Sequence, residues 1–449
     1  MNDWYEAEQR VERAQQFAES QQWAEALTEI NAALRINPHN GGWQAHRGFI
    51  LDQLGEFADA VDAYRAALNL EPGDADVMVA LGIDLARLGR YKQSTRVLGD
   101  VSKLRPELEA AYCYRILAYA EQGEHELAEE MFYLSQQLRE DCPHCFFHIG
   151  SSLAARGQYE KAIFCWLRAL DIDPNYPTVK QYIAQAYRDQ GNLDRAREYY
   201  LAEVREDPGN VDLLFDMAEL ELEAGNPIKA AAKLRQVVEL EPDYGQAHFA
   251  LGEVLLDMEE PQEALEALRT AMELDPGIPR LQLRLGQAYL MLAEYGDAAR
   301  HLSAAYAEEP EDKGALMAWG NCQLRLGRSS EAAETFRRVL ALEEETPDAH
   351  HNLGVCYFLV GEYEDGLRHE LRAIELNPKD VLAMHKAVLA LIHLRRWSEA
   401  RAMIERVLTV DPEDSALRQL RDRLWRLRLR AALAGVVRRV RALIERLRK

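Results

Sequence analysis

The sequence of 449 residues lacks most features of exported, membrane-embedded or disulfide-bonded proteins. Its six cysteines are irregularly spaced and too few for a disulfide framework in a chain of this length. No run of about 18 uninterrupted apolar residues is present, so we do not expect a membrane-spanning helix. Residues 1–10 have neither the basic start nor the apolar core of a signal peptide. These absences predict a soluble, cytoplasmic protein whose thiols are reduced.

Recognisable catalytic motifs are also absent from the sequence. We find no glycine-rich phosphate loop, no nucleophile elbow and no paired metal-ligand motif. We therefore predict that the protein is not an enzyme and binds no cofactor. Alanine, leucine, glutamate and arginine dominate the composition, while glycine and proline stay near their average frequencies, and this mixture indicates a mostly helical chain.

Prolines recur along the chain at a fixed period of 34 residues. Two positions of this series are skipped, at Glu140 and Glu344, and each is followed three residues later by a proline. Counting from the prolines defines twelve consecutive repeats between Ala7 and Asp414, which leaves no room for another domain inside that span. The prolines in register are Pro38, Pro72, Pro106, Pro174, Pro208, Pro242, Pro276, Pro310, Pro378 and Pro412.

Other positions of the repeat follow the same period. The eighth and twentieth positions carry almost only small side chains, which allow two helices to approach closely. Between them a glycine recurs where a first helix would end in a left-handed cap, and the proline then closes a second helix. The recurring glycines are Gly55, Gly89, Gly123, Gly157, Gly191, Gly225, Gly327 and Gly361.

This pattern of helix, glycine turn and helix, as in GWQAHRGFILDQLGEFADAVDAYRAALNLEPGD, resembles the tetratricopeptide repeat (TPR) family over residues 7–414. The resemblance implies an all-α fold, a right-handed superhelical solenoid of antiparallel helix pairs that is stabilised by stacking of neighbouring repeats. A concave groove would be lined by the first helices. We accordingly divide the chain into an N-terminal extension (1–6), twelve repeats (7–414) and a C-terminal amphipathic helix (415–449) that closes the array.

The resemblance also implies where partners bind, because the second, fifth, ninth, twelfth and thirteenth positions of such repeats tend to face the groove. We predict a non-catalytic scaffold that binds a protein partner there, as a peptide or an amphipathic helix. Acidic residues flank an apolar fifth position, which favours a basic or amphipathic ligand; alternatively, the apolar side chains only complete the packing between helices. The predicted groove residues are Phe147, Phe215, Glu219, Phe249, Glu253, Leu283, Met317, Asn321 and His351.

The segment DCPHCFFH places Cys142 and Cys145 at the expected start of a first helix, where the helix N-terminus lowers the pKa of a thiol. A thiol-redox or metal-binding module is therefore an alternative function, and incidental thiols are the simpler explanation. His148 could supply a third metal ligand, and structural zinc needs a fourth, for which Cys113 or His125 could reach. We predict no metal site, and name Cys142, Cys145 and His148 as the candidate ligands should a metal bind.

Residues 415–449 carry eleven arginines and one lysine against two acids, although the whole chain has a net charge of -22. Leucines at spacings of three and four predict an amphipathic helix that caps the array. The excess charge suggests a peripheral membrane adaptor bound to an anionic surface, docking on an acidic protein surface, or contact with nucleic acid, which the acidic body makes unlikely. The predicted contact residues are Arg438, Arg439, Arg441 and Arg446.

Overall fold

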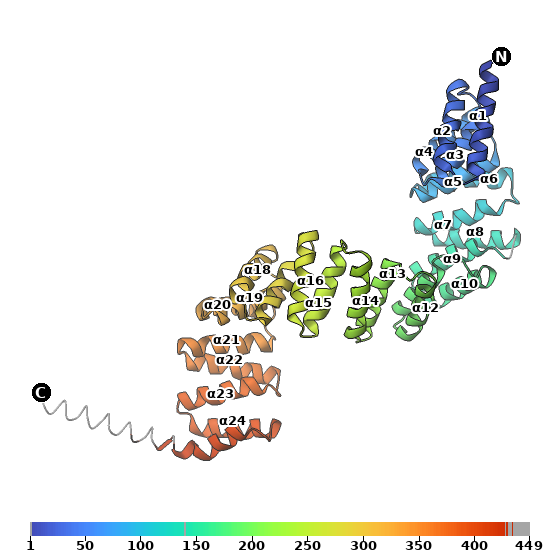
Figure 1. Ribbon diagram of the computed structural model, residues 1–449. Helices are drawn as coiled ribbons and strands as arrows, with labels where there is room; N and C mark the ends of the chain where they lie inside the picture. Colours follow the sequence, from blue (N-terminus) through green and yellow to red (C-terminus); the bar gives the residue numbers. More distant parts are fainter. Residues whose placement is uncertain (1, 139–140, 427, 430–432, 434–449) are drawn as a thin grey trace. The chain divides into compact units, whose positions relative to one another are not determined.

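The structure, a computed structural model, describes residues 2–138, 141–426, 428–429 and 433. This part of the chain contains the helices α1 to α24 and no strand (Figure 1). The chain divides into two compact parts, Met1–Ala224 and Gly225–Lys449, which we call the N-terminal body and the C-terminal body. The predicted all-α fold of paired helices is confirmed.

Thirteen of the labelled helices lie in the described part of the N-terminal body. They are α1 (Asn2–Glu19), α2 (Trp23–Ile36), α3 (Gly41–Gln53), α4 (Phe57–Leu70), α5 (Ala75–Arg87), α6 (Tyr91–Leu104), α7 (Glu109–Glu121), α8 (His125–Leu138), α9 (Pro143–Ala155), α10 (Tyr159–Ile172), α11 (Val179–Asp189), α12 (Leu193–Glu206) and α13 (Val211–Glu223).

The labelled helices of the described C-terminal body continue the same alternation. They are α14 (Pro227–Leu240), α15 (Gly245–Asp257), α16 (Pro261–Leu274), α17 (Leu281–Met291), α18 (Tyr295–Glu308), α19 (Lys313–Arg325), α20 (Ser329–Leu342), α21 (Pro347–Val360), α22 (Tyr363–Leu376), α23 (Val381–His393) and α24 (Trp397–Val410).

The helix boundaries follow the 34-residue period of the sequence. Every even-numbered helix starts at the seventeenth position of a predicted repeat, and most odd-numbered helices start at the first. Helices α11 and α17 start two residues later, because Thr178 and Arg280 have positive φ angles of 64° and 65° and stand outside the helix. Helix α1 starts at Asn2, so it includes the described residues of the predicted extension 1–6.

Backbone hydrogen bonding explains where many first helices begin. An aspartate or asparagine at the N-cap accepts a hydrogen bond from a backbone amide of the first turn, which satisfies a group that the helix leaves without a partner. Because this residue follows the closing proline by two positions, one short loop ends one helix and begins the next. Such caps are Asn40, Asp74, Asn210, Asp312 and Asp380.

The turn inside each repeat has one conformation, whichever residue occupies it. All eight predicted turn glycines have positive φ, so the left-handed caps are confirmed. At the same position in the remaining repeats stand Gln21, Glu259, Ala293 and Arg395, which adopt φ angles of 59° to 60°. A side chain in this region costs on the order of 1 kcal/mol relative to glycine, and the flanking helices hold it there.

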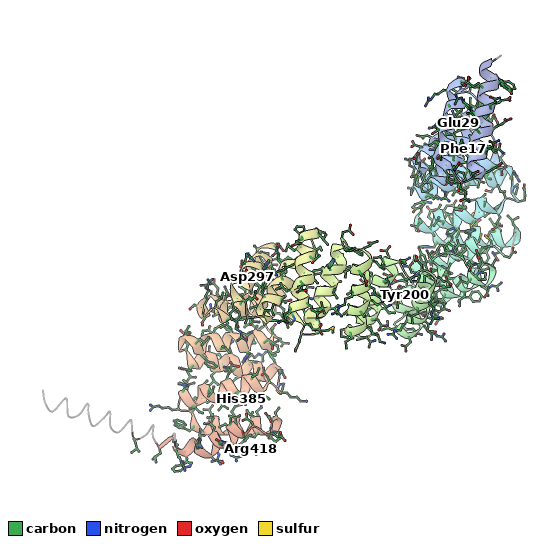
Figure 2. The ribbon with its side chains drawn as sticks, viewed as in Figure 1. Phe17, Glu29, Tyr200, Asp297, His385 and Arg418 are labelled. Carbon is green, nitrogen blue, oxygen red and sulfur yellow. The ribbon has the colours of Figure 1, made fainter. Side chains whose placement is uncertain are left out.

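Glycines at the eighth position allow the two helices of a repeat to touch. A Cβ atom added at Gly320 would lie 2.7 Å from the ring of Phe336, and one added at Gly48 would lie 2.6 Å from Tyr64. The larger partner always stands at the twenty-fourth position, which fills the core; Tyr200, labelled in Figure 2, is a fully buried example. The predicted close approach of helices is thereby confirmed.

Residues 415–426, which follow α24, are also helical. Leu417 is buried against apolar side chains of α23 and α24, as a capping helix would require. The predicted contact residues Arg438, Arg439, Arg441 and Arg446 lie outside the described residues. No helix in the described ranges is both long and apolar enough to cross a membrane.

Candidate functional site

A cleft of about 860 Å³ opens on the first helices of the C-terminal body. It extends over α17, α19, α21 and α23, the last three of which are labelled in Figure 1. Most of the lining comes from the repeat positions that the family resemblance implies for the groove. The lining residues are Leu290, Met291, Ala293, Tyr295, Asn321, Leu324, Arg325, His351, Asn352, Val355, Leu359, Leu382 and Lys386.

Two asparagines on neighbouring first helices meet in this cleft. The side-chain nitrogen of Asn352 donates a hydrogen bond to the side-chain oxygen of Asn321 at 2.9 Å. Within the described residues neither side chain has another hydrogen-bond partner. The pair therefore offers a vacant donor on Asn321 and a vacant acceptor on Asn352, which is the complement of one peptide group.

A buried acid lies behind the cleft. Glu370 on α22 is fully buried at the twenty-fourth position, and its Oε2 lies 2.8 Å from Nδ1 of His351. Burial raises the pKa of Glu370 to about 7, and the hydrogen bond to Glu370 raises the pKa of His351. Both shifts favour a proton shared by the pair. Glu370 thus fixes the orientation of a histidine that lines the cleft.

The rim of the cleft combines aliphatic and basic side chains. Met291, Leu359 and Leu382 are 47%, 62% and 67% exposed, so each would bury apolar surface against a ligand. Arg325 and Lys386 also line the cleft, and neither forms a salt bridge to another residue in the described ranges. The cleft therefore carries two basic side chains that form no salt bridge within the described part of the chain.

Among the groove residues predicted in the C-terminal body, Asn321 and His351 line the cleft, and Met317 is half-buried and packs against the core. Phe249 and Leu283 are only 6% and 2% exposed. These two side chains pack in the interior, which corrects their placement on the binding surface. They stand on α15 and α17, two first helices that contact each other, whereas His351 at the same repeat position stays partly exposed.

Glu253, the remaining predicted residue of this body, faces α17. Its Oε1 accepts a hydrogen bond from Nε of Arg284 at 2.6 Å. An acid that is already neutralised by an arginine offers little attraction to a basic ligand. Glu253 therefore does not favour a basic partner, although the sequence pattern suggests one.

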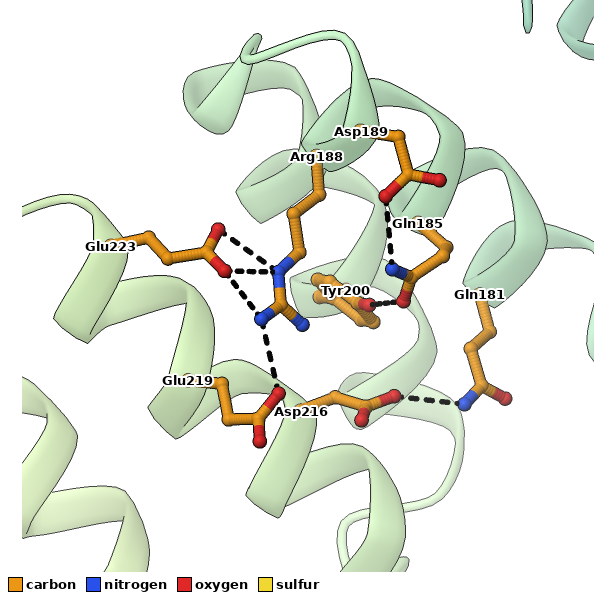
Figure 3. A network of polar contacts seen from close by, with 8 residues as sticks. All are labelled: Gln181, Gln185, Arg188, Asp189, Tyr200, Asp216, Glu219 and Glu223. Atoms are coloured by element: carbon orange, nitrogen blue, oxygen red, sulfur yellow. Dashed lines mark hydrogen bonds and ion pairs between the residues drawn. The ribbon is translucent and has the colours of Figure 1, made fainter. Parts of the chain in front are cut away.

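In the N-terminal body, the corresponding surface is occupied by its own charged groups (Figure 3). Arg188 on α11 donates to Glu223 at 2.5 Å and to Glu219 at 3.0 Å, both on α13. The same hydrogen bonds hold the pKa of Glu223 below its ordinary value. Gln181 donates to Asp216 at 3.1 Å across the same two helices. Glu219 is therefore an internal ion-pair partner, as Glu253 is.

The two predicted aromatic groove residues of the N-terminal body are half-buried. Phe147 packs edge-on against Tyr182, with ring centroids 5.1 Å apart, and lies 5.4 Å from the ring of Tyr176. Phe147 therefore takes part in the packing of its own body. Phe215 stands on α13.

Three thiols converge at the contact between α7 and α9. The sulfur atoms of Cys113, Cys142 and Cys145 lie within 4.8 Å of one another, and all three residues are buried. Hydrogen bonds from Cys113 and Cys142 lower the pKa of Cys145 to about 5. His148 is not in this cluster. Its ring packs against Tyr114, and burial lowers its pKa to about 4.

The comparisons with known proteins agree with the geometry. A family model described as tetratricopeptide repeat matches residues 11–75, 147–211, 215–279, 249–313, 283–343 and 317–381. The chain belongs to this family. No curated protein matches the TPR chain.

Solved structures with related folds include other TPR proteins. The APC/C hetero-tetramer Cut9-Hcn1 is 16% identical with a TM-score of 0.48, covering 92% of this chain and 95% of that chain. YrrB, described as a TPR protein with an unusual peptide-binding site, is 24% identical with a TM-score of 0.37, covering 41% and 96%. Yeast Tom70 is 14% identical with a TM-score of 0.35, covering 99% of both chains.

Sequence reasoning missed several side chains of the TPR cleft. Leu359 and Arg325 stand at the thirteenth position and Leu382 at the second, so the family pattern could have identified them. Asn352 and Lys386 stand at the sixth position, which the predicted groove omitted. Glu370 could have been noticed as an acid in a column of apolar core residues.

Proposed function

We propose that this TPR scaffold binds an extended peptide segment in the cleft of the C-terminal body. The observation that carries the proposal is the Asn321–Asn352 pair, whose vacant donor and acceptor complement the C=O and N–H of a peptide backbone. Two side-chain amides that hold each other in place lose little conformational freedom on binding, which favours affinity.

Apolar and charged contacts would supply the remaining specificity. Met291, Leu359 and Leu382 are exposed around the amide pair and would bury aliphatic or aromatic side chains of the peptide. Arg325 and Lys386 would bind a carboxylate, either a side chain or the chain terminus. We therefore expect a partner segment that is apolar and acidic, in place of the basic segment that the sequence pattern favoured.

The test is a selection of unstructured peptides from a displayed library against the full chain. Affinities of the selected peptides are then measured by fluorescence anisotropy for the wild type and for two matched variants. Leu382→Glu is expected to weaken binding at least about thirtyfold, because it places a charge in the apolar rim and repels an acidic ligand. Leu222→Glu, at an exposed leucine of α13, is the control and should leave the affinity unchanged.

Two results would contradict the proposal. One is a set of selected peptides that bind both leucine variants equally well. The other is a set of selected peptides that have no acidic residues and bind with an affinity that salt does not change. An ionic contact with Arg325 and Lys386 would be weakened by salt.

We also propose that the protein is cytoplasmic and that it binds an anionic membrane surface as a second role. The membrane role is supported by the described residues that follow α24, among which Trp425, Leu429 and Leu433 are exposed, as are Arg426 and Arg428. Sedimentation with vesicles that contain phosphatidylserine tests it. Trp425→Ala should reduce the fraction of protein that sediments with the vesicles. If the wild type and the variant are recovered in the supernatant to the same extent, the membrane role is refuted.

A further inference from the structure

We propose that Cys113, Cys142 and Cys145, together with Glu109, form a structural binding site for one thiophilic metal ion of the zinc type. The three sulfur atoms are already gathered within 4.8 Å of one another. A tetrahedral zinc–thiolate site requires sulfur–sulfur distances of about 3.8 Å, given zinc–sulfur bonds of about 2.3 Å. The side chains need to move by about an ångström or less to reach that geometry.

We assign Glu109 as the fourth ligand; its carboxylate contacts Cys145 but does not lie within 4.8 Å of all three sulfur atoms. It is the first residue of α7, and its Oε1 lies 3.9 Å from the sulfur of Cys145. A sulfur and a carboxylate oxygen bound to the same zinc ion stand about 3.5 Å apart. The site therefore draws two ligands from α7 and two from the start of α9, where Cys142 is the N-cap.

Burial distinguishes this site from a redox centre. Cys113, Cys142 and Cys145 are 3%, 4% and 0% exposed, whereas a thiol that exchanges disulfides must reach its substrate. Two of the nearby histidines are engaged elsewhere, since His144 bonds to the hydroxyl of Tyr176 and His125 bonds to Ser152. The third, His148, lies outside the group formed by the three sulfur atoms. Three thiolates and a carboxylate oxygen would supply the four ligands that a closed tetrahedral zinc site requires.

The packing of α9 supplies an independent reason for a metal here. The other first helices contact the preceding second helix more extensively than the preceding first helix. Helix α9 reverses this order, because it contacts α7 more extensively than it contacts α8. The thiols stand at this unusual contact between two first helices. A bound ion would fasten two successive repeats at a contact where the first helix of one packs mainly on the first helix of the other.

The experiment loads the purified full chain, reduced and freed of metal by a chelator, with Zn²⁺ or Cd²⁺. Inductively coupled plasma mass spectrometry measures the bound metal. The ultraviolet charge-transfer absorption from sulfur to cadmium reports ligation by thiolates. We expect one ion per chain for the wild type and for Cys165→Ser, a buried cysteine of α10 outside the cluster. Cys145→Ser should weaken binding at least about a hundredfold, and Glu109→Gln about tenfold.

Alkylation of the wild-type chain provides a readout that does not depend on the folding of a variant. Bound Zn²⁺ should slow the modification of Cys113, Cys142 and Cys145 and leave that of Cys165 unchanged. The proposal is overturned if the loaded wild type holds no stoichiometric ion, if Cys145→Ser binds as tightly as Cys165→Ser, or if Zn²⁺ leaves all alkylation rates unchanged. An unaltered affinity in Glu109→Gln would overturn the assignment of the fourth ligand.

Discussion

Two surfaces, one in each body, use the same repeat positions for opposite purposes. At the ninth and thirteenth positions the N-terminal body has Glu219 and Glu223, which are both bound to Arg188. The C-terminal body has Asn321 and Arg325 at these positions, and they line a cleft. One surface satisfies its own polar groups, and the other leaves them available to a ligand.

This difference separates what builds the repeat from what can vary. The turn, the eighth-position glycine and the twenty-fourth-position side chain have the same geometry in both bodies. The exposed groove positions, such as those of Leu359 and Leu382, make few contacts that the fold requires, so their side chains can be exchanged at little cost to stability. Binding capacity in such an array is therefore decided by whether neighbouring groove residues neutralise one another.

The largest expected effect comes from the buried acid behind the cleft. The pKa of Glu370 rises from an ordinary value of 4.5 to about 7, so the folded chain keeps a proton that the unfolded chain loses. His351, whose pKa is also raised, acts in the same direction. Stability from the protonated pair is complete below pH 4.5 and is lost as the pH rises through about 7.

Glu370→Leu should therefore stabilise the chain by about 2 kcal/mol at pH 8 and by much less at pH 5. Leucine fits because Leu268 and Leu302 occupy the same position against a glycine. Urea denaturation at both pH values measures the difference, with Glu375→Leu on the exposed face of α22 as the control. Equal effects of the two substitutions would show that the burial of Glu370 does not lower the stability of the chain.

The next effect tests the amide pair itself. Asn352→Ala removes the acceptor offered to a peptide and the bond that holds Asn321, so we expect about tenfold weaker binding of a selected peptide. Gln181→Ala, on the corresponding surface of the N-terminal body, should leave the affinity unchanged. A comparable loss in both variants would erase the functional difference between the two bodies.

A smaller effect on stability is expected from the ion pairs on the N-terminal surface. Arg188→Met keeps the aliphatic packing but removes the ion pairs to Glu219 and Glu223, and should cost about 1 kcal/mol at low salt and less at high salt. The control is Arg195→Met, whose ion pair with Glu198 is well exposed. Denaturation at two ionic strengths measures both, and a salt-independent loss would assign the effect to packing.

The smallest effect concerns the turn at the edge of the cleft. Ala293 has a φ of 60°, so Ala293→Gly should stabilise the chain by about 0.5–1 kcal/mol. Gly327→Ala makes the opposite change in the next repeat, at a φ of 75°, and should destabilise by a similar amount. Thermal unfolding compares the two variants, and shifts of the same sign would contradict the role of backbone strain.

Much of the fold could be predicted because its determinants repeat. The helix boundaries, the left-handed turns and the small residues at close contacts each recur at one period, so errors at single positions do not accumulate. The four turns without glycine, such as that at Arg395, have no local signal and follow only from the register.

The candidate site was less predictable because it depends on pairs of side chains from different repeats. The sequence shows Glu219 and Arg188 separately, but not that they bind each other. It shows Cys142 and Cys145 together, yet the third thiol, Cys113, is 29 residues earlier and joins them only through the contact of α7 with α9. Exposure and pairing are properties of the folded array.

The uniform turn has a consequence for how such a chain can change its length. Because glycine and non-glycine turns adopt the same backbone conformation, a genetic exchange between any two of them joins compatible ends. Duplication or loss of 34 residues then keeps every helix in register with its neighbours. The number of repeats and the identity of the groove residues can therefore evolve as separate traits.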